Sequence, residues 1–305
     1  MRVFVTGATG FIGSAVVSEL IAAGHEVVGL ARSDEGAAAL GAAGAEVQRG
    51  TLDDLDLLRG AAEAADGVIH TAYVHDFSQM AQAAQTDLRV IETLGAALEG
   101  SDRPLVTTFG TAMITPGEVV TEEGRADPAS AAHPRLPNEP VALALASRGV
   151  RSTIIRLAPS VHGEGDHGFV PVLIDVARSR GAAAYVGDGA NRWPGVHRLD
   201  AARLFRLALE RGTAGSVFHG IAEEGVPTRR IAEVMGRHLD VPVISVAPEA
   251  AAEHFGWIGA FFALDIPASS ALTQQRLGWE PARPGLIADL DEGHYFLSSV
   301  VAFRG

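Results

Sequence analysis

The amino-acid sequence of 305 residues contains neither cysteine nor lysine, and each absence excludes a class of chemistry. Without cysteine the chain has no disulfide framework, no thiolate nucleophile and no cysteine-ligated metal. Because all 24 basic residues are arginine, Schiff-base catalysis and the phosphate-binding lysine of a Walker loop are excluded as well. Tyrosine is scarce, so any catalytic phenol must come from one of three residues: Tyr73, Tyr185 and Tyr295.

The charge balance and the lack of a long apolar run narrow the range of partners. The 37 acidic residues outnumber the 24 basic ones, and the net charge of −13 repels phosphate backbones and anionic lipid surfaces. The longest stretch without Asp, Glu or Arg runs only from Val3 to Ser18 and is interrupted by glycine, unlike a membrane span. We therefore expect a cytoplasmic globular protein that acts on a small molecule, with no nucleic-acid or membrane partner; a homodimer stays open.

The N-terminus predicts a dinucleotide-binding turn. Residues 2–6 are a short apolar, β-rich run, and three glycines follow at intervals of three: Gly7, Gly10 and Gly13. Apolar residues then recur at helical spacing: Ile12, Val16 and Leu20. Glycines at such a turn let the backbone approach a diphosphate, and the first N–H groups of the helix bind its charge. A purely structural glycine-rich turn is the alternative.

Alternating strands and helices follow this turn. The segments that predict strands are 26–30, 45–48, 67–72, 103–109 and 152–157, with Ala- and Leu-rich helical segments between them. Repeated βα units predict an α/β fold with a doubly wound parallel sheet. Ligands of such sheets lie beyond the carboxyl ends of the strands.

The end of the second predicted strand favours NADPH over NADH. NAD-preferring sites usually place an acidic residue there to accept from the ribose 2′-OH, but this chain has Arg32. Its guanidinium is positioned to pair with a 2′-phosphate, and a solvated surface arginine is the alternative.

The motifs TGATGFIG, HEVVGLAR, GTLDD, GVIHTA, VTTFGTA and RLAPSVHG together resemble the short-chain dehydrogenase/reductase superfamily in its extended or atypical branch. The resemblance implies an NAD(P)-binding Rossmann domain, 1–160 plus 196–222, and a small C-terminal substrate lobe, 161–195 plus 223–305. It also implies cofactor contacts from the following residues: Gly7, Thr9, Gly10, Phe11, Ile12, Gly13, Arg32, Leu52, Thr71, Ala72, Pro159 and Val161.

The Tyr-xxx-Lys pair with which family members usually reduce carbonyls is missing. Arg135 and Glu139 keep the spacing of the pair with different chemistry. Prolines on both sides, among them Pro137, argue against assuming that the two residues share one helical face.

Four residues are candidates for the missing chemistry. Thr108 and Thr111 lie near the family's catalytic hydroxyl position, where we expect one of them to donate a hydrogen bond to a developing oxyanion. The proton then arrives from water, from Tyr73 after the fourth strand, or from His162 after the sixth. Each has a structural alternative: a β-forming threonine with a satisfied hydroxyl, a packing aromatic, or a structural histidine.

A metal site is not expected. The pairs His70/His75 and His162/His167 are spaced by five, whereas ligands on one helix face are spaced by three or four, and no HExxH sequence occurs.

From Val161 onward aromatic residues gather, which suits either an apolar substrate pocket or a core. The sequence therefore predicts an NADPH-dependent oxidoreductase that reduces a carbonyl or related unsaturated centre of a small, rather apolar substrate. Two alternatives stay open: a non-catalytic NADP(H)-binding redox sensor, and an epimerase or dehydratase that uses bound nicotinamide transiently.

Overall fold

A parallel sheet of seven strands forms the centre of the molecule. The computed structural model describes residues 1–74, 79–112, 114, 117–125 and 134–297. The strands are β1 (Arg2–Thr6), β2 (Glu26–Ala31), β3 (Glu46–Arg49), β4 (Gly67–His70), β5 (Pro104–Gly110), β6 (Arg151–Leu157) and β10 (Ser216–Gly220). Their order is β10-β6-β5-β4-β1-β2-β3, and every neighbouring pair is parallel. The predicted doubly wound α/β fold is confirmed.

Helices cover both faces of the sheet because successive side chains of a strand point to opposite faces. Val3 and Val5 of β1 belong to one apolar core, and Phe4 belongs to the other. The first core is covered by α1 (Phe11–Ala22), α2 (Asp34–Ala42) and α7 (Arg198–Arg211). The second is covered by α3 (Leu55–Glu63), α4 (Met80–Leu98) and α5 (Asn138–Ala144).

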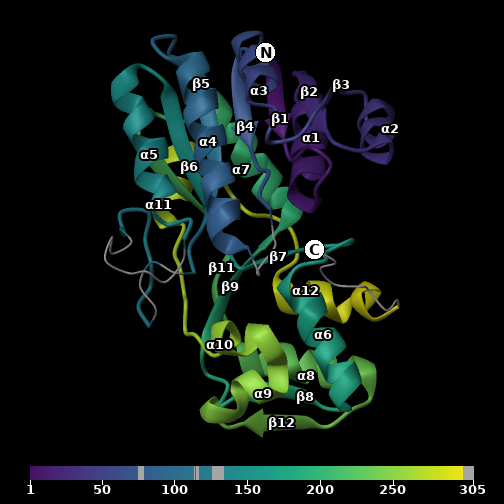
Figure 1. Ribbon diagram of the computed structural model, residues 1–305. Helices are drawn as coiled ribbons and strands as arrows, with labels where there is room; N and C mark the ends of the chain where they lie inside the picture. The colour runs from purple at the N-terminus through teal and green to yellow at the C-terminus, as the bar shows by residue number, and fades with distance from the viewer. Residues whose placement is uncertain (75–78, 113, 115–116, 126–133, 298–305) are drawn as a thin grey trace.

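A smaller C-terminal lobe lies beyond the carboxyl ends of the strands, in the lower part of Figure 1. Its strands are β7 (Ser160–His162), β8 (Ala183–Val186), β9 (Arg192–His197), β11 (Glu223–Pro227) and β12 (Val243–Val246), arranged as sheets β11-β9-β7 and β12-β8. The remaining helices are α6 (Phe169–Arg180), α8 (Thr228–Leu239), α9 (Ala251–Phe255), α10 (Gly259–Phe262), α11 (Ala271–Leu277) and α12 (Leu286–Asp291). Short 3₁₀ turns span Leu145–Arg148, Pro248–Ala250, Gly256–Ile258 and His294–Phe296. Among the described residues, no helix is long and apolar enough to cross a lipid bilayer.

The predicted division of the chain into two domains stays a prediction. Each apolar core nevertheless takes most of its residues from one of the two predicted parts. The lobe has a core of its own, built from α6, α8, α9, α10 and α12. One returning segment departs from the division, since Ala268, Leu277 and Trp279 pack in the core of the large sheet. In that segment α11 ends at Leu277, and Gly278 follows it with φ +62°.

Candidate functional site

The turn between β1 and α1 is a tightly packed backbone cradle. Gly7 has φ +68°, and the N–H of Gly10 donates to its carbonyl at 2.9 Å. A Cβ atom on Gly13 would lie 1.9 Å from the Gly7 oxygen, so only glycine fits there. α1 begins at Phe11 with no side-chain cap and no acidic residue in its first turn. The open N–H groups and the helix dipole at this end suit the diphosphate of a dinucleotide.

Thr71 and Ala72 pack directly against this turn. A Cβ atom on Gly7 would lie 2.7 Å from both the Ala72 nitrogen and the Thr71 Oγ1. The Thr71 hydroxyl donates to the Thr6 carbonyl at 2.8 Å, which joins the end of β4 to the end of β1. The structure thus brings the predicted contacts after β1 and β4 together at one edge of the sheet.

Arg32 follows β2, and its side chain is exposed. Within the described part of the chain its guanidinium makes no hydrogen bond or ion pair. The neighbouring Arg49 is engaged, because it pairs with Asp34 at 2.9 Å and donates to the Ser33 carbonyl. Arg32 therefore offers an unengaged positive charge where a 2′-phosphate would lie, and the preference for NADPH stays a prediction.

A buried polar chain runs from β1 to the segment before α5. Thr6 Oγ1 lies 2.6 Å from His70 Nδ1, and His70 Nε2 lies 3.3 Å from a carboxylate oxygen of Asp87 on α4. Arg135 donates to both Asp87 oxygens, at 3.0 and 2.8 Å, and the Asn138 amide donates to Asp87 at 2.8 Å. Burial alone would raise the pKa of Asp87, but its hydrogen bond from His70 and the charge of Arg135 outweigh burial and lower it.

The Arg135 guanidinium covers two aromatic rings at the ends of β4 and β5. Its Cζ lies 4.1 Å from the ring centroid of Tyr73 and 4.8 Å from that of Phe109. Burial raises the pKa of Tyr73, although the positive charge of Arg135 acts in the opposite direction. We call Tyr73, Asp87, Phe109, Arg135 and Asn138 the Arg135 cluster.

Arg135 and Glu139, which keep the spacing of the family's catalytic pair, point to different partners. α5 begins only at Asn138, with Pro137 as its N-cap, so Arg135 lies outside the helix. Glu139 pairs with Arg156, a fully buried residue of β6. The expectation that the prolines separate the two residues agrees with this geometry.

Thr108 and Thr111 have their hydroxyls engaged by neighbouring strands. Thr108 donates to the His70 carbonyl at 2.9 Å, and Thr111 lies 3.5 Å from the Leu157 carbonyl. Both side chains are buried. Their assignment to catalysis stays a prediction, and the geometry favours a role in holding the end of β5.

His162 lies on the opposite side of its strand from the predicted cofactor contacts. Side chains alternate along a strand, so within β7 Val161 and His162 point to opposite faces, and Pro159 lies in the bend before the strand. The His162 imidazole is fully buried, and its Nδ1 lies 2.9 Å from Asp289 on α12. If Val161 contacts the nicotinamide as predicted, His162 faces away from it.

One group among the described residues has the geometry to hold a metal ion, with ligand atoms of Asp289, Glu292 and His294 within 4.8 Å of one another. Asp289 is already paired with His162, and burial would raise its pKa but the charge and hydrogen bond of His162 lower it. We therefore assign no metal to this group.

The aromatic residues of the lobe form mostly a core. Trp193 and Phe262 are fully buried, and the ring of Phe169 lies 5.0 Å from that of Phe261 and 6.0 Å from that of Trp193. Among the aromatic residues of the lobe that the structure describes, Trp257 alone is half exposed, at 51%. The aromatic surface that the lobe can offer to a ligand is therefore formed by Trp257 and the adjoining ring of Phe169, which we call the outer ring layer, while Trp193 and Phe262 belong to the core.

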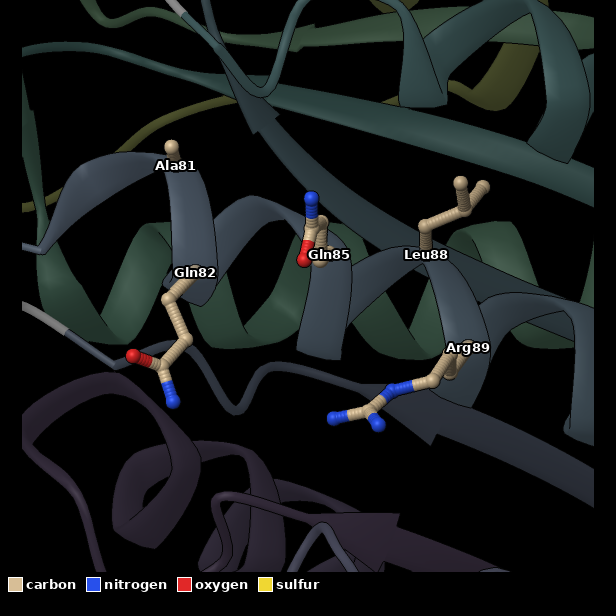
Figure 2. Close-up of a pocket in the computed structure, with 5 residues that line it drawn as sticks. All are labelled: Ala81, Gln82, Gln85, Leu88 and Arg89. Atoms are coloured by element: carbon tan, nitrogen blue, oxygen red, sulfur yellow. The ribbon is translucent and has the colours of Figure 1, made fainter.

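A surface hollow of about 600 Å³ runs along α4 (Figure 2). It is lined by Ala81, Gln82, Gln85, Leu88 and Arg89. Gln82 and Arg89 extend towards the N-terminal part of the chain, and Arg89 reaches Asp53 at 3.4 Å, beside the predicted cofactor contact Leu52. None of these lining residues belongs to the Arg135 cluster.

Two members of the Arg135 cluster, Asp87 and Asn138, are absent from the residues that the sequence singles out. The sequence carries one signal for Asp87, since it lies at helical spacing from the apolar residues Ala84 and Val90, and a helix rarely places an acid on its apolar face without a partner. Asn138 carries no comparable signal.

Comparisons with known proteins agree with this geometry. The model of the NAD dependent epimerase/dehydratase family matches residues 3–219. An uncharacterized protein of Schizosaccharomyces pombe is 54% identical over 297 residues, which are 97% of this chain and 100% of the relative. The 4-hydroxy-2-methyl-3-oxo-4-farnesyl-3,4-dihydroquinoline-1-oxide ketoreductase of Stigmatella aurantiaca is 27% identical, over 84% of this chain and 80% of its own. The dTDP-glucose 4,6-dehydratase of Streptomyces venezuelae has the same fold, with a TM-score of 0.76, 21% identity and 96% of each chain covered.

Proposed function

The chain belongs to the NAD dependent epimerase/dehydratase family, and from that premise we propose that it is an NADPH-dependent oxidoreductase that reduces a carbonyl or related unsaturated centre of a small, rather apolar substrate. The glycine cradle after β1 fits the dinucleotide, because a Cβ atom on Gly13 would fill the space in which the turn closes on the helix. When bound, the reduced nicotinamide supplies a hydride. The protein must then bind and orient the substrate and deliver a proton to its oxygen.

The observation that carries this proposal is the placement of Tyr73 beneath the guanidinium of Arg135. Tyr73 directly follows Ala72, which packs against the glycine turn, so its backbone lies at the carboxyl edge of the sheet, and its ring lies beneath Arg135. Ligands of doubly wound sheets bind at this edge. In this proposal Tyr73 supplies a phenol to the substrate from the segment after β4, although the family's tyrosine position carries an arginine.

Burial raises the pKa of Tyr73, so its phenol is protonated at neutral pH. A protonated phenol can donate its proton to the oxygen of a carbonyl as the hydride arrives, which is the proton transfer that a reductase needs.

In this proposal Arg135 stabilises the negative charge that develops on the substrate oxygen. The Asp87 carboxylate accepts two hydrogen bonds from the guanidinium, at 3.0 and 2.8 Å, and holds it in place. The Asn138 amide donates a third hydrogen bond to Asp87 at 2.8 Å and fixes the carboxylate. A charge fixed before the reaction needs no reorganisation during it. Asp87 acts through Arg135 and is a positioning residue.

The substrate class rests on two features. The outer ring layer of the lobe, with Phe169 and the half-exposed Trp257, suits an apolar molecule. The ketoreductase of Stigmatella aurantiaca acts, by its name, on a farnesylated ketone. The net charge of −13 argues against a polyanionic substrate.

Replacing Tyr73 by Phe tests the proposal. We expect hydride transfer from NADPH to a panel of aldehydes, ketones and activated alkenes to fall by about 10²–10³ in kcat, because one donor to the developing oxyanion is lost. NADPH affinity should stay unchanged. Tyr185→Phe is the matched control, since Tyr185 lies on β8 in the lobe, beneath Arg229.

Two outcomes contradict this assignment in different ways. Full activity of Tyr73→Phe would remove Tyr73 from the chemistry. Tight NADPH binding by the unaltered protein without turnover of any panel member would favour the redox sensor.

A further inference from the structure

Helices α1 and α7 run side by side in the same direction. Arg206 on α7 pairs with Glu19 on α1 at 2.7 Å, and Glu210 pairs with His25 just beyond α1 at 3.0 Å. Later residues of α7 thus meet later residues of α1, so both helices begin at the same end. That end is the carboxyl edge of the sheet, which faces the lobe in Figure 1. Two helix dipoles therefore place their positive ends beside the glycine turn.

Arg198, the first residue of α7, lies at this shared end. Its Cζ is 5.0 Å from the ring centroid of Phe11, the first residue of α1. Its stem passes close to the backbone after β7, since a Cβ atom on Gly163 would lie 3.3 Å from Arg198 Cγ. A Cβ atom on Gly165 would lie 3.9 Å from its Nη1. The guanidinium is thus held between the Phe11 ring and a glycine-containing segment of the lobe.

Within the described part of the chain, Arg198 forms no ion pair, although Asp200 lies two residues after it and Asp166 follows Gly165. Asp200 on the same helix accepts from the N–H groups of Ala282 and Arg283. Asp166 is buried, accepts from the hydroxyl of Tyr295 at 3.1 Å, and burial raises its pKa to about 6. Both carboxylates have other partners, so the positive charge of Arg198 stays available.

We infer that Arg198 binds the diphosphate of the dinucleotide from the side opposite the glycine turn, next to the nicotinamide half. This inference rests on the proposed cofactor. Arg32 lies after β2, towards the adenosine end, whereas Arg198 reaches the α1 N-terminus from the side of the lobe. Arg198 is partly buried, and its guanidinium stacks on the Phe11 ring. This cation–π contact orients the N–H groups and leaves the positive charge without a counter-ion. The two arginines therefore recognise two different phosphate groups of one ligand.

A crossed binding experiment separates the two arginines. Dissociation constants for NADP⁺, NAD⁺ and adenosine 2′,5′-bisphosphate are measured by calorimetry on the unaltered protein, Arg198→Gln and Arg32→Gln. Arg198→Gln should weaken NADP⁺ and NAD⁺ about 10- to 100-fold and equally, because both carry the same diphosphate, and should change the bisphosphate little. Arg32→Gln should weaken NADP⁺ and the bisphosphate and leave NAD⁺ unchanged. Arg211→Gln, the same charge change at the far end of α7, is the control for general electrostatics.

The outcomes separate this inference from the proposed function. If Arg198→Gln binds NADP⁺ and NAD⁺ as tightly as the unaltered protein, the role of Arg198 is refuted and the proposed cofactor stands. If Arg198→Gln weakens the bisphosphate as much as NADP⁺, Arg198 does not act on the nicotinamide-side phosphate. If the unaltered protein binds neither dinucleotide, the proposed function and this inference fail together.

Discussion

The glycine turn after β1 and the Arg135 cluster lie at the same edge of one sheet, but they are built from different parts of the chain. The turn consists of backbone from one short segment, and its shape depends on missing side chains at Gly7 and Gly13. The Arg135 cluster consists of side chains from β5, α4, the segment after β4, the segment before α5 and the first residue of α5. A local backbone shape needs only its own residues, whereas a side-chain cluster needs the fold to assemble it.

The contrast explains how a family can keep its cofactor site while its catalytic residues change. A diphosphate is held by N–H groups that every residue carries, so the glycine spacing is the main requirement. A proton donor needs only a phenol near the substrate oxygen. In the proposed reductase, Tyr73 meets that requirement from the segment after β4, and Arg135 stands where the family resemblance implies the usual tyrosine.

The largest expected effect is at the turn. Gly13→Val should abolish dinucleotide binding, because its Cβ would lie 1.9 Å from the Gly7 oxygen and would force the helix away from the strand. Calorimetry with NADPH measures the loss. Gly60→Val on α3, where a Cβ meets nothing within 4 Å, is the control. Unchanged NADPH affinity in a folded Gly13→Val protein would show that the cradle is not the binding site.

The next effect is at the Arg135 cluster. Asp87→Asn leaves the Arg135 charge without its carboxylate in a nearly buried site, and we expect the free energy of unfolding to fall by about 3–5 kcal/mol. Denaturant unfolding measures it, with the exposed Glu92→Gln on the same helix as the control. A loss below about 1 kcal/mol would mean that the pair adds little to the fold.

The pH dependence of this variant gives a second measurement. The folded pKa of Asp87 lies below its unfolded value, so its contribution is fully present above the unfolded pKa and is lost as pH falls towards the folded one. The stability difference between the unaltered protein and Asp87→Asn should therefore shrink as pH falls below about 4. A difference that stays constant across this range would contradict the lowered pKa.

A smaller effect is expected at the adenosine end of the cofactor. Arg32→Ala should cost about 1.5–3 kcal/mol of NADPH binding and little of NADH binding, because one charge-assisted contact to the 2′-phosphate is removed. Equal weakening of both cofactors would show that Arg32 does not bind the 2′-phosphate.

The smallest effect is expected at Thr108 on β5 and at Thr111 just after it. Because their hydroxyls face the His70 and Leu157 carbonyls, Thr108→Val and Thr111→Val should each lower stability by about 1 kcal/mol and change kcat by less than about tenfold. Steady-state kinetics and thermal unfolding of both variants and the double variant measure this. A fall of about 10²–10³ in kcat would instead support the oxyanion role predicted from the sequence.

The main sheet could be predicted closely from the sequence. Its strands are short apolar runs bounded by glycine, and the segments between them carry apolar residues at helical spacing. The predicted strand at 103–109 is β5 (Pro104–Gly110), and that at 152–157 is β6 (Arg151–Leu157). The lobe could be predicted only as a region, since its strands are short and lie in two separate small sheets. Its returning segment, with Leu277 and Trp279, packs on the large sheet through contacts that no local pattern reveals.

The candidate site likewise has a part that the sequence predicts and a part that it does not. The glycine turn and the position of Arg32 after β2 can be predicted from residues adjacent in sequence. The pairing of Arg135 with Asp87 cannot, because Asp87 lies 48 residues before Arg135. His162 is a second example: its buried contact with Asp289 spans 127 residues and places its imidazole against α12.

The sequence by itself determined the glycine turn, because glycine spacing between a strand and a helix sets a backbone shape through contacts within one short segment, such as that of Gly13 with Gly7. It also excluded lysine and cysteine chemistry, since a missing residue type is missing in any fold. Only the tertiary structure decided which side chains share the site. Parallel strands connected by helices bring their carboxyl ends together from positions far apart in the chain, so Tyr73, Asp87 and Arg135 meet where the sequence shows three separate polar residues.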